Sequence, residues 1–491
     1  MNNNITTYYF LGIGGIGMSA LARYFNAKGF CVMGYDRTCT PLTLELECEG
    51  IDIHYSPQVP SVCCRDAMHC VSTPENTIVV YTPAVPEDFE EFQYFKNNGF
   101  TMLKRAQVLG EITRNSKGIC IAGTHGKTTT STMTAHLLYQ SEIGCSAFLG
   151  GVSKNYDTNL LVGAHLCVRP DTGTNIDNGC AHADNKGAHA GAPLREYVVI
   201  EADEYDRSFH QLTPYMALIT TADADHLDIY GTKEEFRKSF EKFASLVKEN
   251  GFLVVNEKVD LDCRDAMHCV STYTYGMNRG DFHAENITIA NGEITFDFVT
   301  PQETIKNIQL GVPVLINVEN AVGAMALAYL AGVKPEELRN AMATFKGIKR
   351  RFDIQVKTGK IVYIDDYAHH PEELKASISS IKALYPNRKV CGIFQPHLYS
   401  RTRDFAQEFG ASLSLLDELI LLDIYAAREL PIEGITSDVI FENVTIENKM
   451  RAKKEDVLDI LKRKNDIDVL VTFGAGNIDQ LVKPITNLIC Q

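Results

Sequence analysis

A glycine-rich stretch in the first third of the chain has the residue types needed to hold the phosphates of a nucleotide. Its sequence, GTHGKTTT at 123–130, lies between the apolar run ICIA and a segment with helical spacing. Backbone N–H groups of such a loop can surround the β- and γ-phosphates of ATP, the lysine can neutralise their charge, and the next hydroxyl can bind Mg²⁺. Ile121 stands where the standard eight-residue motif has its first glycine, so the loop is a variant. The candidate ATP-binding residues are Gly123, Thr124, His125, Gly126, Lys127, Thr128 and Thr129.

Acidic motifs follow two later apolar runs. EADE begins at Glu201, and DADH ends at His226. Each motif follows a predicted strand, and open α/β sheets bind ligands at the carboxyl ends of their strands. We therefore expect Glu201 and His226, together with Thr128, to hold Mg²⁺ on the nucleotide. Taken alone, each motif is also compatible with a solvent-exposed strand end.

A second glycine-rich turn lies near the N-terminus. The sequence FLGIGGIGMS at 10–19 runs from an apolar strand through closely spaced glycines into a predicted helix. Glycines let the backbone approach a diphosphate at the start of a helix, where free N–H groups favour negative charge. Asp36 follows the next strand at roughly the 20-residue distance at which an acid meets a ribose in dinucleotide-binding folds. A tight turn without a ligand is the alternative. The candidate residues are Gly12, Gly14, Gly15, Gly17, Met18, Ser19 and Asp36.

The composition limits the kinds of partner. The chain has 491 residues, 45% of them hydrophobic, and a net charge of −15. This length exceeds what one core usually holds, so roughly two to four domains are expected. The acidic balance argues against nucleic-acid and anionic-membrane partners, because both need dense Lys/Arg patches. The sequence has neither a secretory signal nor an apolar run long enough to span a membrane, so its 14 cysteines predict free thiols in a reducing cytoplasm.

Strands and helices alternate along most of the chain. Apolar, β-rich runs are separated by segments with helical spacing, which predicts parallel sheets covered by helices, the α/β class. The polar segment TRNSKG and the Gly- and Arg-containing segment FKGIKRRFD favour three domains, at 1–115, 116–346 and 347–491. Residues 163–195 have no apolar period and predict a long irregular loop. The apolar runs are YYFLGI, TIVVYTPA, GICIAGT, YVVIEAD, MALITTAD, FLVVNE, IVYIDDY, KVCGIFQP, ELILLDIY and DVLVTFGAG.

Motifs in all three predicted domains resemble those of the Mur ligase family of peptidoglycan synthesis, and they occur in the family's order. The resemblance implies a Rossmann-like N-terminal domain for a UDP-sugar, a central P-loop-type ATPase domain and a C-terminal Rossmann-like α/β domain for an amino acid. GIGGIGMS and DDYAHHPEE are most similar to the members that add L-alanine. The motifs are GIGGIGMS, GTHGKTTT, EADE, DADHLDIYG, NVENA, RRF, DDYAHHPEE and FQPHLYSRT.

The resemblance also implies an activity. Such an enzyme uses ATP and Mg²⁺ to join L-alanine to the lactyl carboxylate of UDP-N-acetylmuramate through an acyl phosphate, and it releases ADP and phosphate. Three residues depart from the family pattern, namely Thr221, Ile316 and Leu398. The residues implied by the resemblance are Lys127, Glu201, His226 and His369 in catalysis, Asn320 at the adenine, Thr128, Glu201 and His226 at the metal, and Asp366, His369 and Arg401 on the amino-acid side.

Other interpretations stay open at this point. The same UDP-sugar could receive a whole tripeptide, as it does in a recycling ligase. An NAD-dependent oxidoreductase would use the first glycine turn and Asp36, but it would leave GTHGKTTT and EADE without a function. A protein on this scaffold could also bind ATP without turnover. We expect a cytoplasmic monomer or homodimer that acts on small molecules and has no nucleic-acid or membrane partner.

The decapeptide CRDAMHCVST occurs twice, at 64–73 and 263–272. In the first copy Cys64 and Cys70 are six positions apart, whereas paired zinc ligands are roughly two to four residues apart. Both copies lie in connections that precede predicted strands. We therefore interpret both copies, together with the irregular loop at 163–195, as insertions derived from repeated DNA and tolerated in exposed loops.

Overall fold

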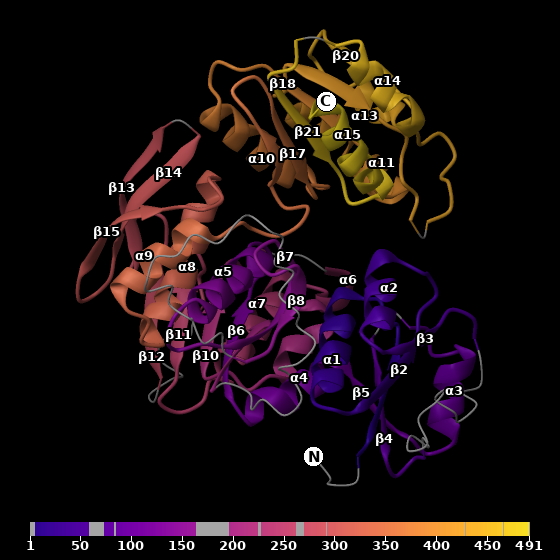
Figure 1. Ribbon diagram of the computed structural model, residues 1–491, viewed down its shortest axis with the longest axis vertical. Coiled ribbons are helices and arrows are strands. Elements are labelled where there is room, and N and C mark those ends of the chain that lie inside the picture. Colours follow the sequence, from indigo (N-terminus) through magenta and orange to yellow (C-terminus); the bar gives the residue numbers. More distant parts are fainter. Residues whose placement is uncertain are drawn as a thin grey trace, which may run out of the picture. The chain divides into compact units, whose positions relative to one another are not determined.

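The computed structural model describes most of the chain (Figure 1). The predictions made above for His226, for 164–195 and for all but the last residues of the two decapeptides lie outside the described residues. The described segments are 5–57, 73–82, 85–163, 196–223, 227–261, 270–290, 292–427, 429–464 and 466–490.

The first sheet has five parallel strands in the order β3-β2-β1-β4-β5 (Figure 1). All residues of its central strand, β1, are buried, as expected for a parallel strand with helices on both faces of its sheet. The strands are β1 (Thr7–Leu11), β2 (Cys31–Tyr35), β3 (Asp52–His54), β4 (Thr77–Tyr81) and β5 (Thr101–Lys104). The helices are α1 (Ile16–Ala27), α2 (Pro41–Cys48), α3 (Glu90–Asn97) and α4 (Arg105–Arg114).

The second sheet has seven strands in the order β12-β11-β10-β6-β9-β7-β8, and only the β7–β8 pair is antiparallel. The strands are β6 (Lys117–Ala122), β7 (Ser146–Ser153), β8 (Thr158–Leu161), β9 (Tyr197–Glu201), β10 (Met216–Ile219), β11 (Phe252–Asn256) and β12 (Ser271–Tyr275). The helical segments that follow these strands are α5 (Lys127–Tyr139), η1 (Tyr205–Gln211), α6 (Leu227–Tyr230), α7 (Lys233–Ala244), α8 (Leu315–Leu330) and α9 (Pro335–Thr344).

The first two sheets are held together by packing and by one buried polar network. Helix α1 packs against β7 and β8 as well as against its own sheet, and the two sheets contribute to a single apolar cluster. Asn159 in β8 is fully buried, and its amide donates to the carbonyl of Ile16 (2.6 Å). Arg23 in α1 donates to the Asn159 side-chain oxygen at 2.7 Å. The start of α1 is thereby fixed to the second sheet.

A small sheet and a third large sheet follow. The small one has the order β13-β14-β15, and the third has the order β16-β17-β21-β18-β19-β20, in which only β16–β17 is antiparallel. The small sheet comprises β13 (His283–Ala290), β14 (Glu293–Val299) and β15 (Thr304–Gln309). The third sheet comprises β16 (Asp353–Lys357), β17 (Val362–Asp366), β18 (Val390–Phe394), β19 (Glu418–Leu421), β20 (Lys449–Arg451) and β21 (Val469–Phe473). The accompanying helices are α10 (Pro371–Leu384), α11 (Tyr399–Asp404), α12 (Ala406–Leu413), α13 (Asp438–Phe441), η2 (Lys454–Asp456), α14 (Val457–Lys462), η3 (Asn477–Leu481) and α15 (Val482–Ile489).

The contacts divide the chain into two compact units. The first holds the two N-terminal sheets, and the second holds the C-terminal sheet with its own apolar core. The first unit comprises 1–284, 298–305 and 320–344, and the second comprises 285–297, 306–319 and 345–491.

The predicted α/β class with parallel sheets is confirmed. Every one of the apolar runs contains a strand. The domain limits at 1–115, 116–346 and 347–491 stay a prediction. Within the described segments, none of the helices is sufficiently long and apolar to cross a membrane.

Candidate active site

The phosphate loop connects β6 to α5. Gly123 and Gly126 have φ angles of +137° and +82°, which residues with a side chain rarely adopt. A Cβ atom on Gly123 would lie 2.0 Å from the Thr220 hydroxyl oxygen and 2.8 Å from the Thr221 backbone nitrogen. The loop therefore requires glycine at this position, because the end of β10 passes directly behind it.

Thr221 supports the loop. Its hydroxyl accepts the N–H of His125 at 2.9 Å, and its carbonyl accepts the N–H of Thr124 at 3.2 Å. Thr221 departs from the family pattern, yet both of its polar groups shape the loop. In this structure the N–H groups of Thr124 and His125 are therefore bonded to Thr221, and their predicted contact with phosphates stays a prediction.

The ammonium of Lys127 is folded back onto the loop. It donates to the carbonyls of Gly123 and Thr124 at 2.5 and 3.3 Å, and to Glu204 at 2.9 Å. An ammonium has three N–H donors, so these three acceptors use all of them. The Glu204 side chain is only 3% exposed. Burial raises the pKa of Glu204 above its ordinary value, and the charge and hydrogen bond of Lys127 act in the opposite direction.

Two of the predicted metal ligands are neighbours. The Thr128 hydroxyl, in the first turn of α5, donates to Oε1 of Glu201 at 3.0 Å. Glu201 ends β9, which pairs with β6, so the sheet places the carboxylate beside the loop. Hydroxyl and carboxylate oxygens are the hard ligands that Mg²⁺ prefers, and these two residues fit such an ion. His226 lies outside the described residues, and elsewhere in the described segments no three His, Cys, Asp or Glu side chains form a cluster that could hold a metal.

Asn320 lies at the base of the phosphate loop. It is buried, and its side-chain oxygen accepts the Thr130 hydroxyl at 3.3 Å. A Cβ atom on Gly126 would lie 2.8 Å from the same oxygen. Helix α8 thus supports the start of α5, and the predicted contact of Asn320 with adenine stays a prediction.

The N-terminal glycine turn is closed by the carboxylate of Asp36. One oxygen accepts the N–H of Gly14 at 2.8 Å, and the other accepts the N–H of Thr38 at 3.0 Å. A Cβ atom on Gly14 would lie 2.8 Å from the Asp36 carboxylate. The residue predicted to meet a ribose therefore holds the turn itself, and its contact with a ribose stays a prediction.

A cavity of about 250 Å³ adjoins this turn. Gly15, Gly17 and Met18 line one side of it, whereas the predicted Ser19 is fully buried. A Cβ atom on Gly17 would lie 2.2 Å from an Arg105 guanidinium nitrogen. Arg105 also pairs with Asp203 of the EADE motif at 3.2 Å. A cation that the sequence interpretation did not include therefore lies against the glycine turn.

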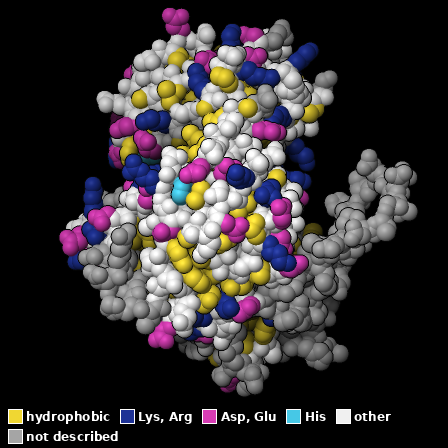
Figure 2. Space-filling view, turned by 90° about the vertical axis from the view of Figure 1, so that its left-hand side faces the viewer, with side chains coloured by type: hydrophobic (Ala, Val, Ile, Leu, Met, Phe, Trp, Pro, Cys, Tyr) yellow, Lys and Arg dark blue, Asp and Glu magenta, His cyan; other side chains and the backbone are white. Residues whose placement is uncertain are grey.

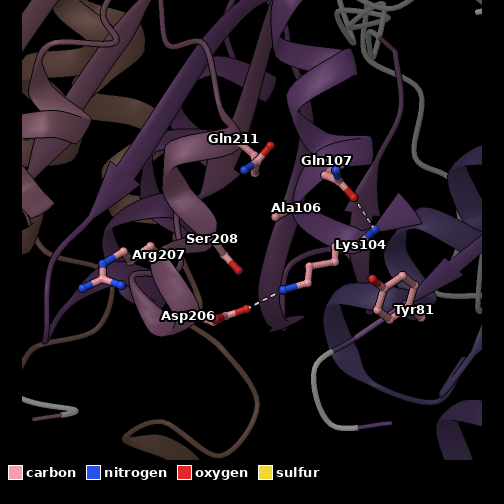
Figure 3. A pocket seen from close by; sticks show the side chains of 8 residues that line it. All are labelled: Tyr81, Lys104, Ala106, Gln107, Asp206, Arg207, Ser208 and Gln211. Atoms are coloured by element: carbon pink, nitrogen blue, oxygen red, sulfur yellow. Dashed lines mark hydrogen bonds and ion pairs between the residues drawn. The ribbon is translucent and has the colours of Figure 1, made fainter. Parts of the chain in front are cut away.

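A second cavity of about 270 Å³ adjoins the first and shares Lys104, Ala106 and Ser208 with it (Figure 3). Lys104 reaches across this cavity to Asp206, with 2.8 Å between the ammonium and the carboxylate. Tyr81 and Ser208 flank this ion pair (Figure 3). Polar side chains therefore extend from the glycine turn to η1, the segment that directly follows Glu204.

The predicted amino-acid residues lie in the second unit. Asp366 ends β17, and its carboxylate accepts the Ser377 hydroxyl at 2.5 Å. Burial raises the pKa of Asp366 to about 6, although the Ser377 hydrogen bond acts in the opposite direction. His369 lies between β17 and α10, and its Nδ1 is 3.0 Å from the Tyr367 carbonyl oxygen and 3.2 Å from Glu373.

Arg401 lies in α11, within the FQPHLYSRT motif. One of its guanidinium nitrogens, Nη1, is buried and has no hydrogen-bond partner among the described residues. The same motif approaches His369 through His397, because the two imidazole centroids are 6.0 Å apart. Leu398, which departs from the family pattern, has a φ of +71°. The structure thus brings two of the quoted motifs together in this unit.

The visible surface carries both signs of charge. On the face shown in Figure 2, Lys and Arg side chains are interspersed with Asp and Glu over the described part of the chain. Because the chain has a net charge of −15, anionic ligands depend on local cations such as Lys127 and Arg105.

Comparisons with known proteins identify the family of the chain. The sequence matches the Mur ligase family, catalytic domain, over 7–117, the Mur ligase middle domain over 121–328, and the Mur ligase, glutamate ligase domain, over 350–476. The chain belongs to the Mur ligase family, so the predicted three-domain architecture of that family is confirmed.

Individual relatives cover the whole chain. A UDP-N-acetylmuramate–L-alanine ligase from Parabacteroides distasonis is 54% identical over 100% of this chain and 98% of its own length. One from Phocaeicola vulgatus is 53% identical over 99% of both chains. The crystal structure of a UDP-N-acetylmuramate-alanine ligase from Thermotoga maritima has a TM-score of 0.77 over 99% of both chains at 23% identity, which shows the shared fold.

The sequence interpretation missed three charged residues at these sites. Glu204 and Glu373 were within quoted motifs, but nothing in the motifs shows that they contact Lys127 and His369. Arg105 carries no local signal, because its contacts with the glycine turn and with Asp203 depend on how two sheets pack.

Proposed function

We propose that the chain joins L-alanine to the lactyl carboxylate of UDP-N-acetylmuramate, with conversion of ATP to ADP and phosphate, as a step in peptidoglycan precursor synthesis. One observation carries the proposal: a full-length relationship at 54% identity to a ligase of that name, in a chain that keeps Lys127 and Thr128 at a phosphate loop. ATP and UDP-sugars are cytoplasmic metabolites, so the reaction would take place in the cytoplasm.

The chemistry requires ATP because a carboxylate does not react with an amine in water. Its carbon is a poor electrophile, and its oxygen is a poor leaving group. Attack of a lactyl carboxylate oxygen on the γ-phosphorus of ATP forms an acyl phosphate and releases ADP. The amine of L-alanine then attacks the acyl carbon, the tetrahedral intermediate collapses, and phosphate leaves with the amide bond formed.

Lys127 would stabilise the phosphoryl transfer. A phosphoryl group in transfer carries spread negative charge, and enzymes accelerate the step mainly by positioning and by electrostatic stabilisation. All three N–H donors of Lys127 are occupied in this structure, so a bound phosphate would replace at least one of the present acceptors. Thr128, Glu201 and His226 would hold Mg²⁺, which when bound neutralises charge on the phosphates.

The N-terminal turn would bind the UDP part of the sugar nucleotide. Gly12, Gly14, Gly15 and Gly17 supply a close backbone approach at the start of α1, and Arg105 supplies a positive charge next to Gly17. The adjoining cavities have neutral polar groups suited to sugar hydroxyls. We propose the limits 1–115, 116–346 and 347–491 for the domains that bind the UDP-sugar, ATP and the amino acid.

Asp366, His369 and Arg401 would serve L-alanine. The Arg401 Nη1 group, which is buried and has no hydrogen-bond partner within the described segments, is suited to a carboxylate, because ionised partners make the strongest hydrogen bonds. The amine of L-alanine is mostly protonated near neutral pH and must lose a proton before attack. His369 is the proposed base for that proton, since an imidazole can accept one in this pH range.

The test is phosphate release measured with all three substrates and with each substrate omitted in turn. The proposal predicts rapid release only when ATP, UDP-N-acetylmuramate and L-alanine are all present. Replacing L-alanine by the tripeptide should give much slower release. Equal or faster release with the tripeptide would instead identify a recycling ligase, and nucleotide binding without release in the complete mixture would identify a non-catalytic protein.

A further inference from the structure

We propose that Glu373 is a positioning residue that fixes His369 in the tautomer with its proton on Nδ1, which leaves Nε2 as the nitrogen able to accept a proton. The inference rests on the proposed role of His369 as the base for L-alanine. Glu373 lies in the DDYAHHPEE motif, but the sequence alone does not indicate a function for it.

The carboxylate of Glu373 is anchored by the backbone. Its Oε2 accepts the N–H of His369 at 3.0 Å and the N–H of His370 at 3.2 Å. The same oxygen lies 3.2 Å from Nδ1 of the His369 ring. One carboxylate oxygen therefore contacts both the backbone and the ring of the same histidine, which restricts the direction in which the ring points.

The partners of Nδ1 determine where the proton is. Nδ1 is near two oxygens, the Tyr367 carbonyl at 3.0 Å and Glu373 at 3.2 Å. A carbonyl and an ionised carboxylate accept hydrogen bonds but cannot donate them. A lone pair on Nδ1 would face both oxygens, so Nδ1 must carry the proton. In a neutral imidazole the other nitrogen, Nε2, then has the lone pair.

Glu373 is ionised under the conditions in which the enzyme would work. Burial alone would raise the pKa of Glu373, but the hydrogen bonds and charge of His369 outweigh this effect and lower the pKa to about 2. The carboxylate therefore remains an acceptor throughout the neutral pH range. It also stabilises the positive charge that His369 gains when it takes a proton from the amine.

The contacts of Glu373 exceed those of a helix cap. A glutamate three residues after the cap position commonly accepts the N–H of the cap residue, which here is His370. Glu373 makes that bond, but it also contacts the backbone and ring of His369, which precedes the cap. Two further rings lie around His369, since the centroid of Tyr367 is 5.2 Å away and that of His397 is 6.0 Å away. The imidazole is thus held at its Nδ1 edge, and both neighbouring rings meet it in an edge-to-face arrangement.

The direct test is ¹⁵N NMR of the histidine rings in the full-length protein, with the His369 signals assigned from a His369→Asn variant. The wild-type protein should show His369 with the proton on Nδ1 in its neutral form. Glu373→Leu removes the ionised acceptor and leaves the neutral carbonyl of Tyr367 beside Nδ1. Because a bond to an ionised acceptor is the stronger one, part of the population should shift to the Nε2–H tautomer. Glu373→Gln, which keeps an oxygen able to accept the same bonds, should retain the Nδ1–H tautomer.

Kinetics provide the second readout, and Glu372→Leu is the matched control because Glu372 is the exposed neighbour in the same helical turn. Glu373→Leu should lower kcat by about 10- to 100-fold, the range for loss of a group that orients a functional histidine. KM for ATP and for UDP-N-acetylmuramate should stay unchanged. The control should behave like the wild type.

Two results would overturn the inference. One is a wild-type His369 with its proton on Nε2. The other is a folded Glu373→Leu variant that keeps both the wild-type tautomer and the wild-type kcat. If Glu373→Leu does not fold, Glu373→Ala, which removes the same carboxylate, takes its place in both measurements. The tautomer is measured without turnover, so its measurement does not depend on the proposed ligase activity. Failure of that activity would be detected in a separate assay, as absence of L-alanine-dependent phosphate release by the wild type.

Discussion

Two glycine-rich turns in this chain have the same local construction but opposite charge. Each follows a buried parallel strand and starts a helix, α1 in one case and α5 in the other. In the first turn a carboxylate, Asp36, accepts the N–H of Gly14. In the second the ammonium of Lys127 donates to two carbonyls of the loop. The first turn thus carries an anion of its own, and the second carries a cation.

The difference is consistent with two kinds of phosphate ligand. Lys127 and Thr128 each have a carboxylate partner, Glu204 and Glu201, which fits a site that handles a triphosphate and its metal. The N-terminal turn takes its positive charge from Arg105, a residue of another element. A glycine turn by itself is therefore a weak indicator of its ligand. The charged residues packed against the turn indicate the ligand more strongly.

The largest expected effect is that of Lys127→Ala. Loss of a group that stabilises transferred charge typically costs about 10²- to 10³-fold in turnover, so phosphate release should fall by at least that factor. UDP binding, measured by calorimetry, should stay unchanged because the two turns are proposed to bind different ligands. Substantial remaining turnover would remove the assignment of the phosphate loop, and a parallel loss of UDP binding would indicate that the two sites are not independent.

The glycines of the two turns should differ in their tolerance of alanine. Gly123→Ala places a Cβ 2.0 Å from the Thr220 hydroxyl at a φ of +137°, whereas the closest atom to a Cβ on Gly12 is 3.6 Å away at a φ of +82°. The first change should cost near the upper end of the roughly 1–3 kcal/mol range for strained backbone, and the second near its lower end. Apparent midpoints of thermal unfolding with and without ATP will measure both. Equal midpoints for the two variants would contradict the difference in backbone constraint.

The metal requirement should be sensitive to change at only one of the turns. In Glu201→Gln one carboxylate beside Thr128 is lost, so the Mg²⁺ concentration for half-maximal activity should rise by roughly 10-fold or more. Asp206→Asn is a suitable control, because Asp206 pairs with Lys104 in the same part of the chain but does not contact Thr128. An unchanged Mg²⁺ titration in Glu201→Gln would argue that the metal is held elsewhere.

The smallest effect is expected for Asp36→Asn. The amide oxygen can still accept the N–H of Gly14, so the turn should persist, whereas the charge, the bond to the N–H of Thr38 and the proposed bond to a ribose are lost. Such a bond contributes about 1 kcal/mol, which corresponds to roughly a 5-fold increase in KM for UDP-N-acetylmuramate. The kcat and the Mg²⁺ titration should match those of the wild type. A change in the Mg²⁺ requirement would contradict the separation of the two turns.

The large sheets and the phosphate loop could be predicted from the sequence because their signals are local. The run MALI is apolar throughout, and YVVIE is buried up to its last residue, Glu201, as expected for buried parallel strands. The small sheet was not predicted, because β13 and β15 are polar strands with few buried residues. Apolar runs alone cannot identify such strands.

The neighbours of site residues could be predicted only in part. Glu201 beside Thr128 follows from strand ends in one sheet. The pairing of Glu204 with Lys127 and of Arg105 with Asp203 depends on side-chain directions and on packing between elements 77 and 98 residues apart. The hydrogen bond from the Gly14 N–H to Asp36 could not be predicted either. The spacing of the glycines does not show which group accepts a hydrogen bond from their backbone N–H groups.

The most direct test of the proposed chemistry follows an oxygen atom. UDP-N-acetylmuramate labelled with ¹⁸O at both oxygens of its lactyl carboxylate is converted with ATP and L-alanine, and the released phosphate is analysed by mass spectrometry. If the carboxylate attacks the γ-phosphorus and the acyl phosphate then loses phosphate to the amine, one ¹⁸O atom must appear in each phosphate. Unlabelled phosphate, released together with the ligated product, would contradict activation of the carboxylate by ATP.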